Sequence, residues 1–155
     1  MPRSLGLRQL SHSKGWLGFF LGLCVPHVAR KLYNPAMYSQ QLLSYFQDER
    51  NVGEVARPDL LAQVENPVCG DVLRLTAKVE DRRMTEVRFK VKGCVPAMAC
   101  SAALCELLTG CSLEQAARLT RQQLIDRVGG LPPASDHASY LATDALALLL
   151  RNLRS

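Results

Sequence analysis

Residues 72–92 read VLRLTAKVEDRRMTEVRFKVK, and this stretch decides the fold. Apolar and polar residues alternate from residue 72 to residue 80, and again from residue 87 to residue 92. Alternation of this kind indicates half-buried strands, and Asp81-Arg82-Arg83 between the two runs has the composition of a turn. The stretch therefore predicts an antiparallel hairpin with one face turned to solvent. Its inner face is expected to hold Leu73, Leu75, Ala77, Val79, Val87, Phe89 and Val91.

Helices are predicted on the carboxyl side of this hairpin. Residues 97–109 are apolar around most of a helical circumference, which is typical of a buried helix, and Gly110 is a natural stop. Ser112 and Thr120 each begin a capping box, in which the side chains at both ends satisfy free backbone N–H groups. Two short helices are therefore expected to start at these positions.

A last helix is predicted over residues 137–153, capped by Asp136 or Ser135 after the extended Leu131-Pro132-Pro133 linker. Its inner face is expected to hold Tyr140, Leu141, Ala145 and Leu148. On the amino side, residues 38–48 have the spacing of a short amphipathic helix, and residues 59–64 fit either a further turn or a short strand. Strands followed by helices, without βαβ alternation, indicate an α+β domain: a small antiparallel sheet with helices packed on one face.

The net charge of +5 belongs entirely to residues 1–36. This leader holds five basic residues and no acid, whereas residues 37–155 hold 14 basic and 14 acidic residues. A neutral body lacks the basic surface that phosphate contacts need, which argues against a nucleic-acid partner. The apolar run at residues 16–25 is too short to span a membrane. We expect residues 37–155 to be the domain, and the leader either to play no part in it, to target an organelle or to direct export.

Five of the six cysteines lie in the body, and no two of them have CxxC spacing. Because an odd number cannot pair completely, we expect reduced thiols in a reducing compartment. This is the cytoplasm, or an organelle matrix if the leader is a transit peptide. Cys105 and Cys111 lie in or just beyond the apolar helix and are expected to be core residues.

Four candidate metal ligands are expected at one end of the hairpin. Cys69 and Asp71 precede its first strand and Cys94 follows its second, and these two strand ends share one edge of an antiparallel pair. His137 is the only histidine of the body and begins the last helix. Two thiolates, an imidazole and a carboxylate suffice for a tetrahedral metal site, and a mixed cysteine and histidine set can also hold a two-iron cluster. Each residue alone also fits a structural role, as a core thiol, a turn acid or a helix-start residue.

Several segments of the body resemble landmarks of one family, the iron–sulfur cluster assembly scaffolds of the NifU amino-terminal and IscU-like type. They occur in the family's order along nearly all of residues 37–155, which is far more specific than any single motif. They are Tyr38-Ser39, Arg50 to Gly53, Pro67 to Asp71, Phe89 to Cys94, Ala97 to Ala103, Leu131-Pro132-Pro133 and Asp136 to Ser139.

The resemblance implies a non-enzymatic scaffold that binds iron or a labile 2Fe-2S cluster and passes it to acceptor proteins. It implies thiolate ligation by Cys69 and Cys94, a carboxylate at Asp71 that makes the cluster labile, and an alternate ligand at His137. It also implies a cysteine desulfurase as partner and no membrane partner. The sequence is compatible with a monomer, with a homodimer that shares a cluster, and with zinc in the isolated protein.

Two positions depart from the family pattern. Ala138 stands where the family has a third cysteine, the thiol associated with sulfur acceptance from the desulfurase, so direct persulfide loading is not implied here. Cys100 is the only nearby substitute, and we expect it to be a buried structural thiol instead. Ala134-Ser135 stand where the chaperone-binding motif of IscU-like members continues with valine and lysine, which leaves a chaperone partner open.

Two other functions also fit the sequence. A degenerate family member would hold structural zinc, or no metal, and act as a binding partner of the assembly machinery. A thiol enzyme would use Cys94 as nucleophile and His137 as base, although no orienting third group or oxyanion motif is evident.

Overall fold

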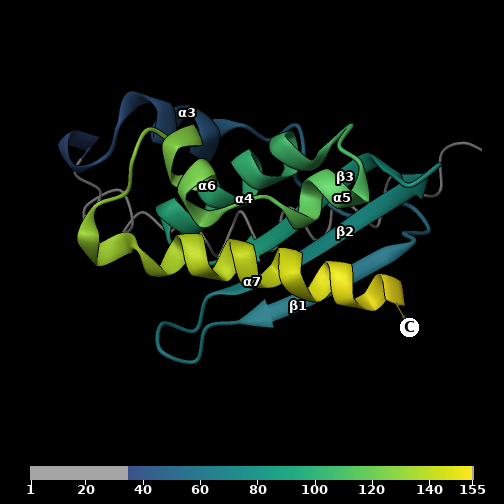
Figure 1. The fold of residues 1–155 in the computed structure, drawn as a ribbon. Coiled ribbons are helices and arrows are strands. Elements are labelled where there is room, and N and C mark those ends of the chain that lie inside the picture. Colours follow the sequence, from purple (N-terminus) through teal and green to yellow (C-terminus); the bar gives the residue numbers. More distant parts are fainter. Residues whose placement is uncertain (1–34, 155) are drawn as a thin grey trace, which may run out of the picture. The chain divides into compact units, whose positions relative to one another are not determined.

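The computed structural model describes residues 35–154, and the leader expected at residues 1–36 lies outside them except for its last two positions. A three-stranded antiparallel sheet in the order β1-β2-β3 forms one layer (Figure 1). The strands span Leu60–Glu65 (β1), Val72–Glu80 (β2) and Arg83–Lys92 (β3). The predicted fold class is confirmed, and the segment expected at residues 59–64 to be a turn or a short strand forms β1, which begins one residue later.

The turn of the hairpin is one residue shorter than predicted. Glu80 pairs directly with Arg83, so only Asp81 and Arg82 connect the strands, with φ of 49° and 62°. Two consecutive residues at positive φ make a type I′ turn, whose twist matches that of the flanking strands. β3 therefore begins at Arg83, earlier than the alternation from residue 87 indicated.

The register of the hairpin determines where the candidate ligands lie. Val72 at the start of β2 is paired with Lys92 at the end of β3. Asp71 and Gly93, one residue further on in each case, are thus neighbours at one edge of the sheet. The convergence expected from the strand order is present.

One face of the sheet is covered by helices. α7 (His137–Arg151) packs on β1 and β2, and α4 (Val95–Leu108) packs on β3 and on α7 (Figure 1). α3 (Gln40–Gln47) lies on α4, and the two capping boxes begin α5 (Leu113–Ala117) and α6 (Arg121–Arg127) as predicted. Single 3-10 turns span Pro35–Met37 (η1), Pro133–Ser135 (η2) and Asn152–Arg154 (η3). None of the helices in residues 35–154 combines the length and apolar character that crossing a membrane requires.

The core lies between the sheet and these helices. Of the seven residues predicted on the inner face of the hairpin, six are buried and Val79 is half-buried. Phe89 is the largest fully buried side chain, and burial of such a side chain contributes about 1.5–3 kcal/mol. The core extends into α4, whose Cys100 and Cys105 are completely buried.

Two burial predictions are wrong. Thr76, assigned to the solvent face, is only 1% exposed because the chain before β1 crosses that face, and the Val55 N–H donates to the Thr76 hydroxyl at 3.0 Å. Tyr140, assigned to the inner face of α7, is 50% exposed. The buried stripe of α7 instead runs through residues three or four apart: Ala138, Leu141, Ala142, Ala145, Leu146 and Leu149.

Candidate metal centre

The tight loop between β1 and β2 holds Cys69 and Asp71. The Asn66 carbonyl accepts a hydrogen bond from the Gly70 N–H at 2.8 Å, and the Asn66 side chain accepts one from the Val68 N–H at 2.9 Å. Gly70 has φ of +73°, a conformation that strongly favours glycine. The loop leaves Cys69 exposed at the surface, whereas Asp71 is buried with 7% exposure.

Gly93 makes room for the Asp71 carboxylate. A Cβ atom at position 93 would lie 2.8 Å from Asp71 Cγ and 3.1 Å from both of its oxygens, closer than van der Waals contact allows. The next residue, Cys94, occupies the N-cap position of α4. Glycine at position 93 therefore lets the two strand ends approach until Asp71 meets the Cys94 thiol.

His137 is the first residue of α7 and comes to the site from the opposite side. Its Nε2 atom lies 3.5 Å from Cys94 Sγ and 3.7 Å from Asp71 Oδ2. The linker before it contains Gly129 and Gly130, both at positive φ, and the prolines of η2. The side chain of His137 is 34% exposed.

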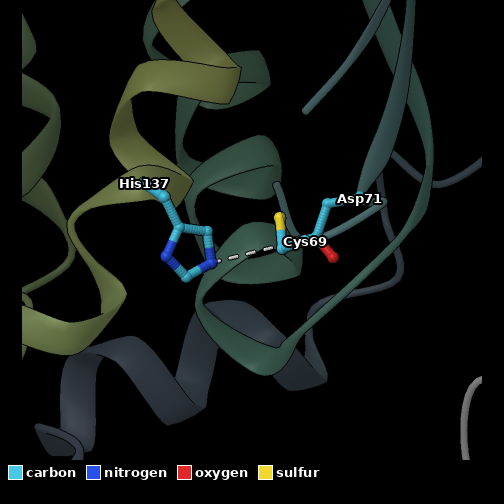
Figure 2. A group of neighbouring side chains, drawn as sticks. All are labelled: Cys69, Asp71 and His137. Carbon is cyan, nitrogen blue, oxygen red and sulfur yellow. Dashed lines mark ion pairs between the residues drawn. The ribbon is translucent and has the colours of Figure 1, made fainter. Parts of the chain in front are cut away.

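All four predicted ligands are brought together. Figure 2 shows Cys69, Asp71 and His137 pointing toward one another, and their ligand atoms all lie within 4.8 Å of one another. Cys94 is not part of this mutually close trio, but its Sγ lies 3.4 Å from Asp71 Oδ2 and contacts His137 as well. Spacings of a few ångström are what donors around one small ion require.

The Cys94 thiol is protonated in this arrangement. Burial raises the pKa of the Cys94 thiol to about 12, the Ala97 N–H acts against this shift, and the Asp71 carboxylate acts with it. An activated thiol nucleophile needs the opposite shift, toward a lower pKa. The contact between Cys94 and His137 that a thiol enzyme needs is therefore present, but the raised pKa of Cys94 argues against a reactive thiolate. A metal must displace the Cys94 proton to bind there, so binding releases a proton.

The donor set is chemically mixed. Soft thiolates suit iron–sulfur clusters, whereas a carboxylate is a hard ligand and imidazole is intermediate. Cys69 is exposed, Cys94 and His137 are half-buried, and Asp71 is buried. Such an arrangement can hold an ion or small cluster among the deeper ligands while keeping Cys69 accessible to an approaching partner.

None of the thiols in residues 35–154 replaces the one expected at position 138. Ala138 is 1% exposed and belongs to the core. Cys100 is fully buried because α4 begins directly after Cys94, and burial raises the pKa of the Cys100 thiol to about 12. The expectation that Cys100 is a buried structural thiol is confirmed, as is the core position of Cys105. Cys111 is only half-buried and its Sγ donates to the Leu107 carbonyl at 2.9 Å, so its assignment to the core is wrong.

Two residues near the site escaped the sequence-based reasoning. Gly93 is the first of them, although a glycine directly before a candidate ligand is itself a signal that backbone and side chains approach closely. Arg121, at the start of α6, contacts three residues of the first turn of α7. No sequence signal connects Arg121 with that turn. The Gly-Gly and Pro-Pro linker between the two helices does not by itself determine how they face each other.

Comparisons with known proteins agree with this architecture. The family model described as NifU-like N terminal domain matches residues 37–154. Iron-sulfur cluster assembly scaffold protein IscU 1 of Archaeoglobus fulgidus is 40% identical over 110 residues, which cover 71% of this chain and 72% of that protein. The IscU scaffold protein of Aquifex aeolicus is 34% identical over 117 residues, 74% of each chain. The crystal structure of the N-terminal part of a NifU-like protein from Brucella abortus shares the fold, with a TM-score of 0.61 at 23% identity, covering 76% of this chain and 94% of that one.

The fold and the clustered donors define a small α+β protein with a candidate mixed-ligand metal centre. The chain belongs to the NifU N-terminal, IscU-like family of iron–sulfur cluster assembly scaffold proteins, as its residue pattern predicted. This is a family of scaffolds rather than enzymes, and an iron–sulfur cluster is its transient cargo. None of these comparisons supports the expectation of zinc.

Proposed function

We propose that residues 37–155 assemble an iron–sulfur cluster on Cys69, Asp71, Cys94 and His137 and pass it on. The cargo is iron or a labile 2Fe-2S cluster. A cysteine desulfurase supplies the sulfur, and acceptor proteins receive the product. The observation that carries the proposal is the approach of four chain-distant donors, with His137 Nε2 and Asp71 Oδ2 both within 3.5 Å of Cys94 Sγ. The five free thiols of the body support work in a reducing compartment, the cytoplasm.

The mixed ligand set suits a scaffold because it separates holding from release. The Cys69 and Cys94 thiolates hold the cluster, since sulfur donors bind iron–sulfur clusters strongly. The Asp71 carboxylate is a harder and weaker ligand for such a cluster, and the His137 imidazole is intermediate. A cluster held by two strong and two weaker ligands is bound long enough to form and can still be given up.

Anaerobic reconstitution with iron and sulfide tests the proposal. The parent chain should develop the visible absorbance of a protein-bound cluster, and Cys69→Ala and Cys94→Ala should lose most of it. Cys111→Ala is the matched control, because Cys111 is a free thiol outside the site. Equal cluster yield in the parent and in both ligand variants contradicts the proposal.

A transfer step then separates a scaffold from a protein that merely retains its cluster. The reconstituted parent is mixed with an apo-ferredoxin. The cluster should move to the ferredoxin faster than it decays on the parent protein alone. A parent that forms a cluster but keeps it indefinitely is a storage protein, not a scaffold.

Ala138 favours one alternative, a family member that acts as a binding partner of the assembly machinery without carrying a cluster. Among the described residues no thiol takes the missing position, since Cys100 is fully buried. Metal analysis of the protein as purified separates the two functions. Absence of reconstitution together with tight binding to a cysteine desulfurase supports the alternative, and a stoichiometric, non-exchanging zinc supports a structural metal.

A further inference from the structure

The first turn of α7, which presents His137, is held from outside by one side chain. Arg121 is the first residue of α6, and its Nη1 atom lies 2.6 Å from Asp136 Oδ1 and 3.1 Å from Ser139 Oγ. Its guanidinium carbon lies 4.2 Å from the centre of the Tyr140 ring. Arg121 thus contacts the residue before His137 and two of the three residues after it.

The backbone of this turn is also fixed by η2 directly before it and by the burial of Ala138 and Ser139, but none of these contacts is a side-chain cap. The first N–H groups of a helix have no partner within the helix, and the N-cap side chain usually satisfies one of them. Asp136 is the N-cap of α7, but its side chain makes no capping hydrogen bond and is bound to Arg121 instead. The linker that leads to it contains two glycines at positive φ, followed by Pro132 and Pro133, which restrict the backbone but contribute no side chain that orients the turn.

We propose that Arg121 is a positioning residue that holds the His137 ring toward Cys94 and Asp71. This inference rests on the proposed function of the site. The Nη1 group donates to both Asp136 and Ser139 while the guanidinium lies over the Tyr140 ring, and together these contacts fix the orientation of the turn. Arginine suits this task better than lysine because its planar group can also stack on an aromatic ring. The Ser139 hydroxyl completes the arrangement by donating to the Asp136 carbonyl at 2.7 Å.

Arg121→Gln removes the clamp, and Arg118→Gln is the matched control. Arg118 is an exposed arginine at the C-cap of α5, and none of the described residues forms an ion pair with it. Each variant removes one positive charge, but only the first releases the start of α7. Arg121→Lys keeps the charge and the reach to Asp136 and should restore part of the effect.

The first measurement uses the metal-free full chain and therefore does not depend on cluster binding. The imidazole proton signals of His137 are identified by their loss in His137→Ala, since His12 and His27 also contribute signals. They should shift and broaden in Arg121→Gln and stay unchanged in Arg118→Gln. Unchanged His137 signals in Arg121→Gln overturn the proposal, whatever the protein binds.

The second measurement follows loss of the reconstituted cluster to a chelator. Loss of a supporting contact around a metal ligand typically weakens binding by about 10- to 100-fold, so Arg121→Gln should lose its cluster at least about tenfold faster. In a His137→Ala background the same substitution should add nothing, because Arg121 acts through the ring. A full effect of Arg121→Gln in that background shows a general structural role and overturns the proposal. A parent that forms no cluster contradicts the proposed function alone, and the imidazole signals then still decide the role of Arg121.

Discussion

Substitution of Gly93 by alanine probes the packing at the centre of the site. The new Cβ would lie 2.8 Å from Asp71 Cγ, and ordinary contact begins near 3.4 Å, so the carboxylate must retreat by about 0.6 Å. Asp71 is buried and short, which leaves it little freedom to give way. Overpacking of this kind costs about 1–3 kcal/mol of unfolding free energy.

The Asp71→Ala background supplies the control for this substitution. Removing the carboxylate removes the atoms with which the Cβ collides. Gly93 does not have a positive φ, so alanine is acceptable there to the backbone and lowers the entropy of the unfolded chain. In that background Gly93→Ala should therefore be neutral or stabilise the protein by about 0.4–1 kcal/mol.

Chemical denaturation of the four metal-free proteins completes the double-mutant cycle. The expected coupling energy between Gly93 and Asp71 is at least about 1 kcal/mol, from the difference between the two costs above. The same cost of Gly93→Ala in both backgrounds would refute the close approach of Gly93 and Asp71, and with it the geometry of the site. Because the carboxylate is displaced, Gly93→Ala should also slow release of a reconstituted cluster, as Asp71→Ala does.

Three further predictions concern the ligands and the core. Asp71→Ala should lose its cluster to a chelator more slowly than the parent, since a labilising ligand is gone; faster loss would make Asp71 a holding ligand. Ala138→Cys should slow cluster loss by supplying the thiolate found in the family, at a cost in stability of no more than about 1–3 kcal/mol for the added sulfur; an unchanged rate would show that position 138 does not reach the cluster. Burial holds the pKa of Cys100 at about 12 when folded, so this thiol's contribution to stability is complete below the pKa of the unfolded chain and is lost as the pH rises toward 12. Between about pH 8 and pH 10.5, denaturation of the metal-free parent should show a steeper loss of stability than Cys100→Ala, by up to about 1.4 kcal/mol per pH unit; equal slopes would contradict it.

The hairpin could be predicted from the sequence because its alternation leaves one possible inner face. A register error of one residue would expose Leu75 and Phe89, so burial itself selects the pairing that places Asp71 beside Gly93. The capping boxes at Ser112 and Thr120 were predictable for a similar reason, since each is a local pattern that acts within four residues.

Features that depend on distant segments could not be predicted in this way. Thr76 is buried because the chain around Val55 crosses the outer face of the sheet, and no periodicity in β2 records that crossing. Tyr140 is exposed, and its ring lies under the Arg121 guanidinium from another helix, a contact that the spacing within α7 does not reveal. Asp136 is a residue type that often caps helices, yet its carboxylate forms an ion pair with Arg121 instead of capping α7. The candidate ligands could be recognised in the sequence, whereas the residues that position them could not.

The central claim is that sulfur, nitrogen and oxygen donors from distant parts of the chain meet at one iron centre. X-ray absorption at the iron edge of the reconstituted protein measures this directly. The parent should show sulfur together with lighter donors, including the outer-shell scattering of an imidazole ring. That scattering should disappear in His137→Ala, and the sulfur contribution should fall in Cys94→Ala. Identical iron spectra in the parent and both variants would contradict the account.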